Sequence, residues 1–383
     1  MPDEPVRRGP VHLTLRMGRT MARPVPREVA DALLSAQVTM TTGERSGFQL
    51  AFDLSRRGLI NTRLLPDGWF DPPVRVVLTT TVQGATTVLM DGVAMRQEVG
   101  ISNEPGQSTL TVTGEDLTVL MDLEERAGQD FPDMAPSARV RQIIDRYAGY
   151  GITPQVVPEL IPQIPLRTRR IDFQSGTDLA YVTELARANG FVFFLDPGPR
   201  PGASRAYWGP EWRIGTPQRA LNVNMDALSN VDQLTFSYDG AAREEPEARV
   251  QNQRTRGSQV LNVLGVPEIS VLRPPLARRP APALKKRVLS DTAKKEGGEG
   301  LAEAVARAAE SSDAISGSGQ LDVVRYGYVL RPRELVGVRG AGLTYDGEYF
   351  VKSVTHDLRR GSYTQNFTLA REGLVARHAT VRP

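Results

Sequence analysis

The chain has 383 residues, of which 40% are hydrophobic and 24% charged, and it carries no cysteine. This length and composition predict two or three soluble domains, and the 35 glycines and 28 prolines favour a chain rich in turns. The lack of cysteine excludes disulfides, thiol nucleophiles and thiolate metal sites. The formal net charge of only +3 argues against a strong nucleic-acid-binding field.

The first hundred residues alternate apolar and other side chains with a period of two. Phe48, Leu50 and Phe52 follow this pattern, and Val74–Val82 repeats it, as expected of strands with one buried face. Turn signals such as Asn103–Gly106 separate the runs. Several short strands with such turns indicate a barrel or a sandwich. We therefore predict a first antiparallel β-barrel domain over residues 1–114.

The period then changes to that of a helix. Apolar residues after Ser137 fall on one helical face, and a second helix is predicted to begin at Ser175–Asp178, a Ser-x-x-Asp capping pattern. Asp178 also suits the positive end of the helix dipole. After the Asn189–Gly190 stop comes an apolar strand, Phe191–Leu195. These elements predict a small α/β middle domain over residues 115–215.

Strand patterns return near the C-terminus. Val231–Tyr238 alternates, and the last β-block runs over Val323–Arg371. The two pieces predict a second β-barrel domain, residues 216–255 and 316–375, followed by a tail, residues 376–383. Residues 256–315 between them are expected to be an inserted linker with an Ala-rich helix, and Ser316–Gly319 is expected to be a flexible joint. The predicted fold class is thus mainly β with an α+β insertion.

No pattern in the chain points to catalysis or to a cofactor. Of the three histidines, His356 lies in a predicted strand and is expected at the surface or in an interface of the sheet, and its neighbour Asp357 would point to the opposite face. Nucleophile-elbow, phosphate-loop and common metal-ligand spacings do not occur. The adjacent pairs Glu124–Glu125 and Glu244–Glu245 are interpreted as solvated charge. We expect no enzyme activity, no metal and no cofactor.

One charge feature is unusual. Basic residues gather in a segment rich in proline and alanine: Arg278, Arg279, Lys285, Lys286 and Arg287, with Lys294 and Lys295 further on. No aromatic residues are interleaved, so the stacking platforms of a single-strand binder are missing. Two interpretations stay open, a solvated loop or a contact with a partner, such as an acidic neighbouring subunit or passing cargo. The aromatic cluster Tyr207, Trp208 and Trp212 is typical of core or interface packing.

The order of elements resembles a known family. An aromatic strand, a Gly-Thr-Asp-Leu-Ala-Tyr-Val helix start, an Asn-Gly stop and a Phe-rich strand fill Ile171–Leu195, and a closing β-hairpin block fills Gly327–Leu369. The chain is similar in this to hub proteins of phage tail baseplates, the late control D family, and to the related hub portion of type VI secretion spike proteins and contractile injection systems. The resemblance implies two β-barrel, tube-like domains in each chain.

The resemblance also implies an assembly role. Hubs of this kind form homotrimers whose six barrels make a pseudo-sixfold ring, which joins the hexameric inner tube above to a trimeric spike below. Only ten residues follow Gly373, so a separate spike protein is expected, with no lysozyme domain. Surrounding baseplate proteins are further partners, and nucleic acid is a partner only if the channel belongs to a phage tail.

The compartment and the alternatives follow from the same sequence. No secretory signal and no stretch of roughly 18 apolar residues are found, so we expect no membrane anchor. Assembly in the bacterial cytoplasm, then incorporation into a tail or injection particle, is the expected localisation. A non-catalytic adhesion or carbohydrate-binding β-module is the alternative, which the missing signal disfavours. An enzyme built from unremarkable Asp, Glu and Ser residues is a third.

Overall fold

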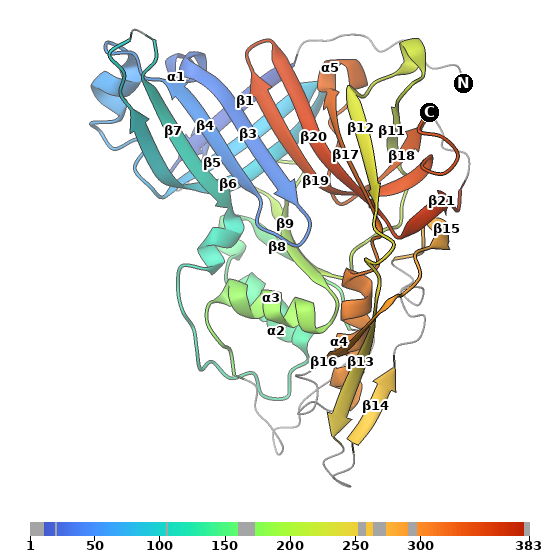
Figure 1. Ribbon diagram of the computed structural model, residues 1–383. Coiled ribbons are helices and arrows are strands. Elements are labelled where there is room, and N and C mark those ends of the chain that lie inside the picture. Colours follow the sequence, from blue (N-terminus) through green and yellow to red (C-terminus); the bar gives the residue numbers. More distant parts are fainter. Residues whose placement is uncertain are drawn as a thin grey trace.

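The protein is mainly β, as the sequence predicts, and its computed structural model is shown in Figure 1. The structure describes residues 11–19, 21–104, 106–159, 173–251, 258–262, 273–289 and 297–378. Two β-units stand side by side, with a middle segment below the first and a projecting arm below the second (Figure 1). Within these residues no helix combines the length and apolar character needed to span a bilayer.

In the first β-unit the run through Phe48, Leu50 and Phe52 confirms the alternation expected from the sequence, whereas the run Val74–Val82 does not, because it is buried continuously from Val76 to Thr80. Phe48, Leu50 and Phe52 are buried, and Gln49 between them is exposed. The elements of this unit are β1 (His12–Gly18), β2 (Arg23–Pro24), α1 (Arg27–Ala32), β3 (Leu33–Thr41), β4 (Gly47–Asp53), η1 (Ile60–Leu64), β5 (Val74–Val82), β6 (Ala85–Gly100) and β7 (Thr109–Asp116).

The last block of strands in the second β-unit begins at Ile315, before the expected start at Val323. The elements of this unit are β11 (Gln218–Asn222), η4 (Asp226–Leu228), β12 (Gln233–Tyr238), β17 (Ile315–Asp322), α5 (Val323–Tyr326), β18 (Leu335–Arg339), β19 (Gly347–Arg359) and β20 (Ser362–Arg371). The flexible joint predicted at Ser316–Gly319 is wrong, because these residues lie inside β17. Glycine is needed there for close packing: a Cβ at Gly317 would meet the Phe236 ring at 2.9 Å, and one at Gly319 the Phe367 ring at 2.6 Å.

The two β-units share one 13-stranded sheet. Strand β19 makes the connection, since one of its edges pairs first with β18, through Gly347–Phe350, and then with β3, through Ser353–Arg359. Both pairings are antiparallel. One hydrophobic core runs beneath both units, from Leu15 and Phe52 to Tyr349 and Phe367. The chain therefore joins the two β-units into one rigid body.

Both units have the same strand order. In the first, the order across the sheet is β1-β5-β6-β7-β4-β3, and in the second it is β11-β18-β19-β20-β17-β12. Numbered one to six along the chain within each unit, with the two-residue strand β2 left out, both orders are 1-4-5-6-3-2. Each pairing has the same direction in both units except that β1–β5 is antiparallel and β11–β18 is parallel. The chain thus contains two copies of one β-architecture.

The middle segment packs helices against a small sheet. Its elements are η2 (Leu117–Met121), α2 (Pro136–Asp145), η3 (Ala148–Tyr150), β8 (Ile152–Val156), α3 (Asp178–Ala188), β9 (Val192–Pro197) and β10 (Ser204–Gly209). The cap of α3 is Thr177, whose hydroxyl accepts from the Ala180 N–H at 3.2 Å, and not the predicted Ser175. The resemblance motif begins at Ile171 and Asp172, which lie outside the described residues.

The arm is inserted between β12 and β17. It consists of a sheet in the order β14-β13-β16, covered on one face by a helix. The elements are β13 (Glu244–Gln251), β14 (Ser258–Asn262), β16 (Lys285–Leu289) and α4 (Gly297–Glu310), and beside the arm β15 (Ala277–Pro280) pairs with β21 (Gly373–Ala376). Ala248, Ala304 and Ala308 form its small core. The region expected to be a linker with a helix therefore also contributes three strands.

The insertions gather at one end of the sheet, which we call the lower end. The equivalent hairpins differ most there: β3 and β4 are joined by residues 42–46, five residues, and β12 and β17 by residues 239–314, 76 residues that include the arm. The middle segment follows β7 at the same end (Figure 1). At the upper end, β4–β5 and β17–β18 both carry a short helical turn, η1 and α5. The two units thus differ less at the upper end, where β4–β5 is joined by residues 54–73 and β17–β18 by residues 323–334, than at the lower end.

Candidate functional site

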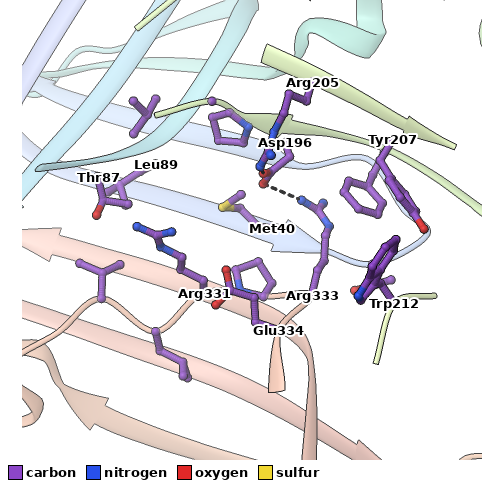
Figure 2. A pocket seen from close by; sticks show the side chains of 18 of the residues that line it. Met40, Thr87, Leu89, Asp196, Arg205, Tyr207, Trp212, Arg331, Arg333 and Glu334 are labelled. Carbon is purple, nitrogen blue, oxygen red and sulfur yellow. Dashed lines mark hydrogen bonds and ion pairs between the residues drawn. The ribbon is translucent and has the colours of Figure 1, made fainter. Parts of the chain in front are cut away.

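A cavity of about 490 Å³ lies where both β-units meet the middle segment. Figure 2 shows side chains from all three parts around it. Its walls include Met40 of β3, Thr87 and Leu89 of β6, Asp196, Arg205 and Tyr207 of the middle segment, Trp212, and the segment Arg331–Glu334 before β18. The cavity is therefore at the junction of the three parts.

Arg333 links the walls of this cavity. Its guanidinium donates to the Thr41 carbonyl at 2.8 Å, lies 4.0 Å from the centre of the Phe194 ring and 3.7 Å from the Asp196 carboxylate. Burial lowers the pKa of Arg333, and the charges of Asp196 and Asp116 oppose that shift. Asp196 is also paired with Arg205 at 2.7 Å. These contacts bind the first β-unit, the middle segment and the second β-unit together, which suits a rigid joint.

A cluster of buried charges lies next to the cavity. Glu211 and Asp313 accept from the Arg213 guanidinium at 2.6 and 2.7 Å, and Lys352 Nζ lies 2.6 Å from Glu211 and 3.1 Å from Asp313. Arg273 is 3.5 Å from both carboxylates. The five residues come from the segment after β10, the base of the arm and β19. The cluster therefore fastens the arm to the second β-unit.

The cluster holds its members in their charged states. Burial alone would raise the pKa of Glu211, but Arg213, Arg273 and Lys352 lower it to about 2. The same cations hold the pKa of Asp313 well below its ordinary value despite its burial. Burial opposes the charge of Arg213, yet Asp313 and Glu211 raise its pKa. Because each charge is compensated by close partners, the cluster is suited to fixing geometry and not to proton transfer.

A second polar centre lies at the start of α3. Asp178 is buried and accepts from Arg146 at 2.9 Å, from the Tyr147 hydroxyl at 2.8 Å and from Gln174 at 2.7 Å. The sequence suggested only a favourable interaction with the helix dipole. The structure shows in addition that this carboxylate ties α3 to the end of α2.

His356 was expected at the surface or in an interface of the sheet; it is buried within the chain, so the surface position is wrong. Its Nδ1 lies 2.8 Å from the Tyr363 hydroxyl, and its Nε2 has no hydrogen-bond partner. It faces inward because β19 is covered on that side by the core shared by the two units. Burial lowers the pKa of His356 to about 3, so the ring is neutral in the folded protein at neutral pH.

We expect acid to destabilise the protein through His356. Its ordinary pKa of 6.5 falls to about 3 on folding, so below pH 6.5 the unfolded chain binds a proton that the folded chain does not. The free energy of unfolding should therefore fall by about 1.4 kcal/mol per pH unit from this group as the pH drops from 6.5 towards 3. Urea titrations at several pH values should show this slope reduced in His356→Gln. An unchanged slope would contradict the assignment.

The other residues singled out in the sequence are spread over the surface and the core. Trp208 is buried, and Trp212 is exposed at the cavity. Glu124 and Glu125 are exposed, but Glu244 is mostly covered and pairs with Arg287 at 3.2 Å. In the part of the chain that the structure describes, no three His, Cys, Asp or Glu residues are placed to hold a metal ion.

The basic residues occupy strands. Arg278 and Arg279 lie on β15, and Lys285, Lys286 and Arg287 lie on β16, all exposed. Strand β15 pairs with β21, and β16 with β13, so the segment is ordered by two different sheets. Lys294 and Lys295 lie outside the described residues. Their role as a partner contact stays a prediction.

The sequence matches no family model and no curated protein, whereas the structure is similar to several solved ones. A tail protein from Neisseria meningitidis aligns with a TM-score of 0.63 at 14% identity, over 95% of this chain and 98% of that chain. The 43 kDa tail protein of prophage MuSo2 from Shewanella oneidensis gives 0.59 at 13% identity, over 95% and 99%. The E. coli c3393 protein, a component of the type VI secretion system, gives 0.53 at 12% identity, over 92% and 77%.

These comparisons define the class of fold. The chain has the mainly β fold of phage tail proteins, which a type VI secretion component shares. This is the kind of fold that the sequence's resemblance to tail hub proteins predicted, and at 12–14% identity the likeness is one of fold. The likeness extends over nearly the whole chain, so both β-units, the middle segment and the arm belong to the compared architecture.

Proposed function

We propose that this chain is the structural hub of a contractile tail or injection-system baseplate, acting as a homotrimer. The observation that carries the proposal is the strand order 1-4-5-6-3-2 found in both β-units. Three chains arranged about one axis would present six similar β-units. Such a ring matches a hexameric inner tube while keeping threefold symmetry for a trimeric spike. The tail-protein fold supports the same role.

The difference between the two ends supports an orientation. At the upper end the connections of the two β-units differ less than at the lower end, and both units carry a short helical turn there, so three chains would offer six related surfaces. We assign this end to the tube. At the lower end each chain contributes one arm and one middle segment. Three of each would form a threefold surface, and we assign this end to the spike. Surrounding baseplate proteins are further proposed partners. The proposed location of the chain is the baseplate of a phage tail or injection particle.

The orientation can be tested with inserted tags. The β19–β20 turn at Gly361 lies at the upper end and the β3–β4 turn at Gly43 at the lower end, and both glycines have open space around them. A small folded tag inserted at Gly361 should block co-sedimentation of the chain with assembled inner tubes of the same particle. The same tag at Gly43 should leave it intact. Block by the Gly43 tag alone would reverse the orientation, and no tube binding by the untagged chain would contradict the hub proposal.

The proposed role requires no catalysis. The buried carboxylates Glu211 and Asp313 are held ionised by neighbouring cations, and neither is poised to exchange a proton near neutral pH. We predict that the purified chain does not release soluble fragments from peptidoglycan. Turbidity loss in a peptidoglycan suspension, compared with a lysozyme control, measures this. Activity that survives repeated purification would contradict the prediction.

A further inference from the structure

The two flanks of the lower end carry opposite charge. We call Arg278, Arg279, Lys285, Lys286 and Arg287 the basic strap, and the exposed residues Glu124, Glu125, Asp130 and Asp133 the acidic loop. We propose that copies of this chain contact each other head to tail, with the basic strap of one against the acidic loop of the next. The inference rests on the proposed trimer and names the residues of its subunit contact.

The basic strap has the character of an interface. Arg287 pairs with Glu244 at 3.2 Å, whereas the side chains of the other four cations form no ion pair within the described residues, although Lys285 and Lys286 lie across the sheet from Glu244 and Glu245. Leu284 and Val288 lie among them and are 67% and 52% exposed. Strands β15 and β16 each have one paired edge in the described part of the chain, so their other edges are free. A charged strap with exposed apolar side chains and free strand edges favours a protein partner over solvent.

The acidic loop has the matching chemistry. Glu125 and Asp130 are exposed carboxylates, and Glu124 is held beside Arg126 at 2.5 Å without being covered. Leu123 and Phe173 are 59% and 58% exposed next to them. An isolated antiparallel β-bridge between Phe173 and Asp130 holds Phe173 beside the acidic loop. The loop thus offers negative charge and apolar surface, the complement of the basic strap.

The acidic loop and the arm lie at opposite ends of α3. The acidic loop is attached at the start of α3, where the Arg126 N–H donates to the Gly176 carbonyl at 3.0 Å. The arm packs at its other end, where a Cβ on Gly190 would lie 2.8 Å from Ala306 of α4. The 11 residues of α3 span about 16 Å. Strand β15, which carries Arg278 and Arg279, lies on the side of the chain away from the middle segment and its acidic loop (Figure 1), whereas β16 is the edge strand of the arm's sheet opposite β14.

This placement selects one kind of association. A contact of strap on strap, or of loop on loop, would bring like charges together, whereas a contact of strap on loop brings opposite charges together. Because Arg278 and Arg279 lie on the side of the chain away from the acidic loop, repeated strap-on-loop contacts run head to tail and can close into a ring. The basic strap would also attract nucleic acid. Binding of a single strand, however, uses aromatic side chains that stack on the bases, and the apolar residues among these cations are Leu284 and Val288. The acidic loop would have no role in binding nucleic acid. A second copy of the chain accounts for both surfaces.

Charge reversal with rescue tests the contact. Sedimentation equilibrium of the full chain at low salt measures the trimer dissociation constant of K285E/K286E, R278E/R279E and E125K/D130K. Each pair should weaken assembly about tenfold or more. R278E/R279E is the less ambiguous strap variant, because Arg279 pairs across the sheet with the uncharged Leu374, whereas Lys285 and Lys286 lie opposite Glu244 and Glu245. Combining R278E/R279E with E125K/D130K should restore most of the affinity. R56E/R57E, an exposed pair at the upper end, is the matched control and should change nothing.

The outcomes separate this inference from the proposed function. A wild-type trimer that none of the strap or loop reversals weakens would overturn the contact and leave the hub proposal standing. A chain that stays monomeric at high concentration would overturn both. Reversals that weaken the trimer without rescue in the combined variant would also overturn the pairing. Tight binding of a 20-nucleotide DNA strand, lost in R278E/R279E but with the trimer intact, would assign the basic strap to nucleic acid instead.

Discussion

Replacing Arg213 with methionine is expected to lower the free energy of unfolding by about 3–5 kcal/mol, because it leaves buried carboxylates without their main partner. Arg213 is almost fully buried and donates to both Glu211 and Asp313. Methionine retains much of the aliphatic volume, so the loss would come from the charge and not from a cavity. Denaturant titration of the wild type and the variant at pH 7 measures the difference.

The pH dependence of the same variant adds a check. Glu211 has a pKa of about 2 in the folded protein against an ordinary value of 4.5, so its stabilising contribution is present above pH 4.5 and is lost as the pH falls towards 2. The wild-type and Arg213→Met curves should therefore converge at low pH. Arg96→Ala is the control, since Arg96 pairs with Glu98 on the surface and should change stability by less than about 1 kcal/mol. Equal effects of the two substitutions would contradict the account.

Replacing Asp178 with alanine is expected to cost about 3–4 kcal/mol, because three buried or half-buried donors lose their acceptor. Arg146, Tyr147 and Gln174 all donate to this carboxylate. The link between α2 and α3 should loosen, so hydrogen exchange should accelerate at the start of α3 while β19 and β20 stay protected. Asp145→Ala on the exposed end of α2 is the matched control and should be nearly neutral. A stable Asp178→Ala variant with unchanged exchange would refute the role assigned to this residue.

The sequence predicted those helices and strands that are determined by residues close to one another in the chain. The alternation through Phe48, Leu50 and Phe52 was a reliable sign of a half-buried strand, because each residue type reports directly on its own exposure. The helix face of Val140, Ile143 and Ile144 was equally informative. The α3 cap was misplaced by two residues, since both Ser175 and Thr177 can cap and only the backbone conformation decides between them.

Ambiguous residue types and long-range contacts limited the rest. Gly317 and Gly319 have the composition of a joint, but they serve as space for two aromatic rings that no local pattern places there. The segment that carries the basic strap is rich in proline and lysine, which are disfavoured in strands, so β15 and β16 were not predicted. The pairing of β19 with β3 and the cluster of Glu211, Arg213 and Asp313 join residues distant in the chain. Such contacts leave no periodic signal in one sequence.

The central claim is that two β-units of one design allow three chains to imitate sixfold order. Electron cryo-microscopy of the assembled full-length chain, reconstructed without imposed symmetry, tests it most directly. We predict three copies in which first and second β-units alternate around the axis in steps of about 60°, with the arms and middle segments at one end only. A reconstruction in which the two units of each chain are stacked along the axis, or a twofold assembly, would contradict the claim.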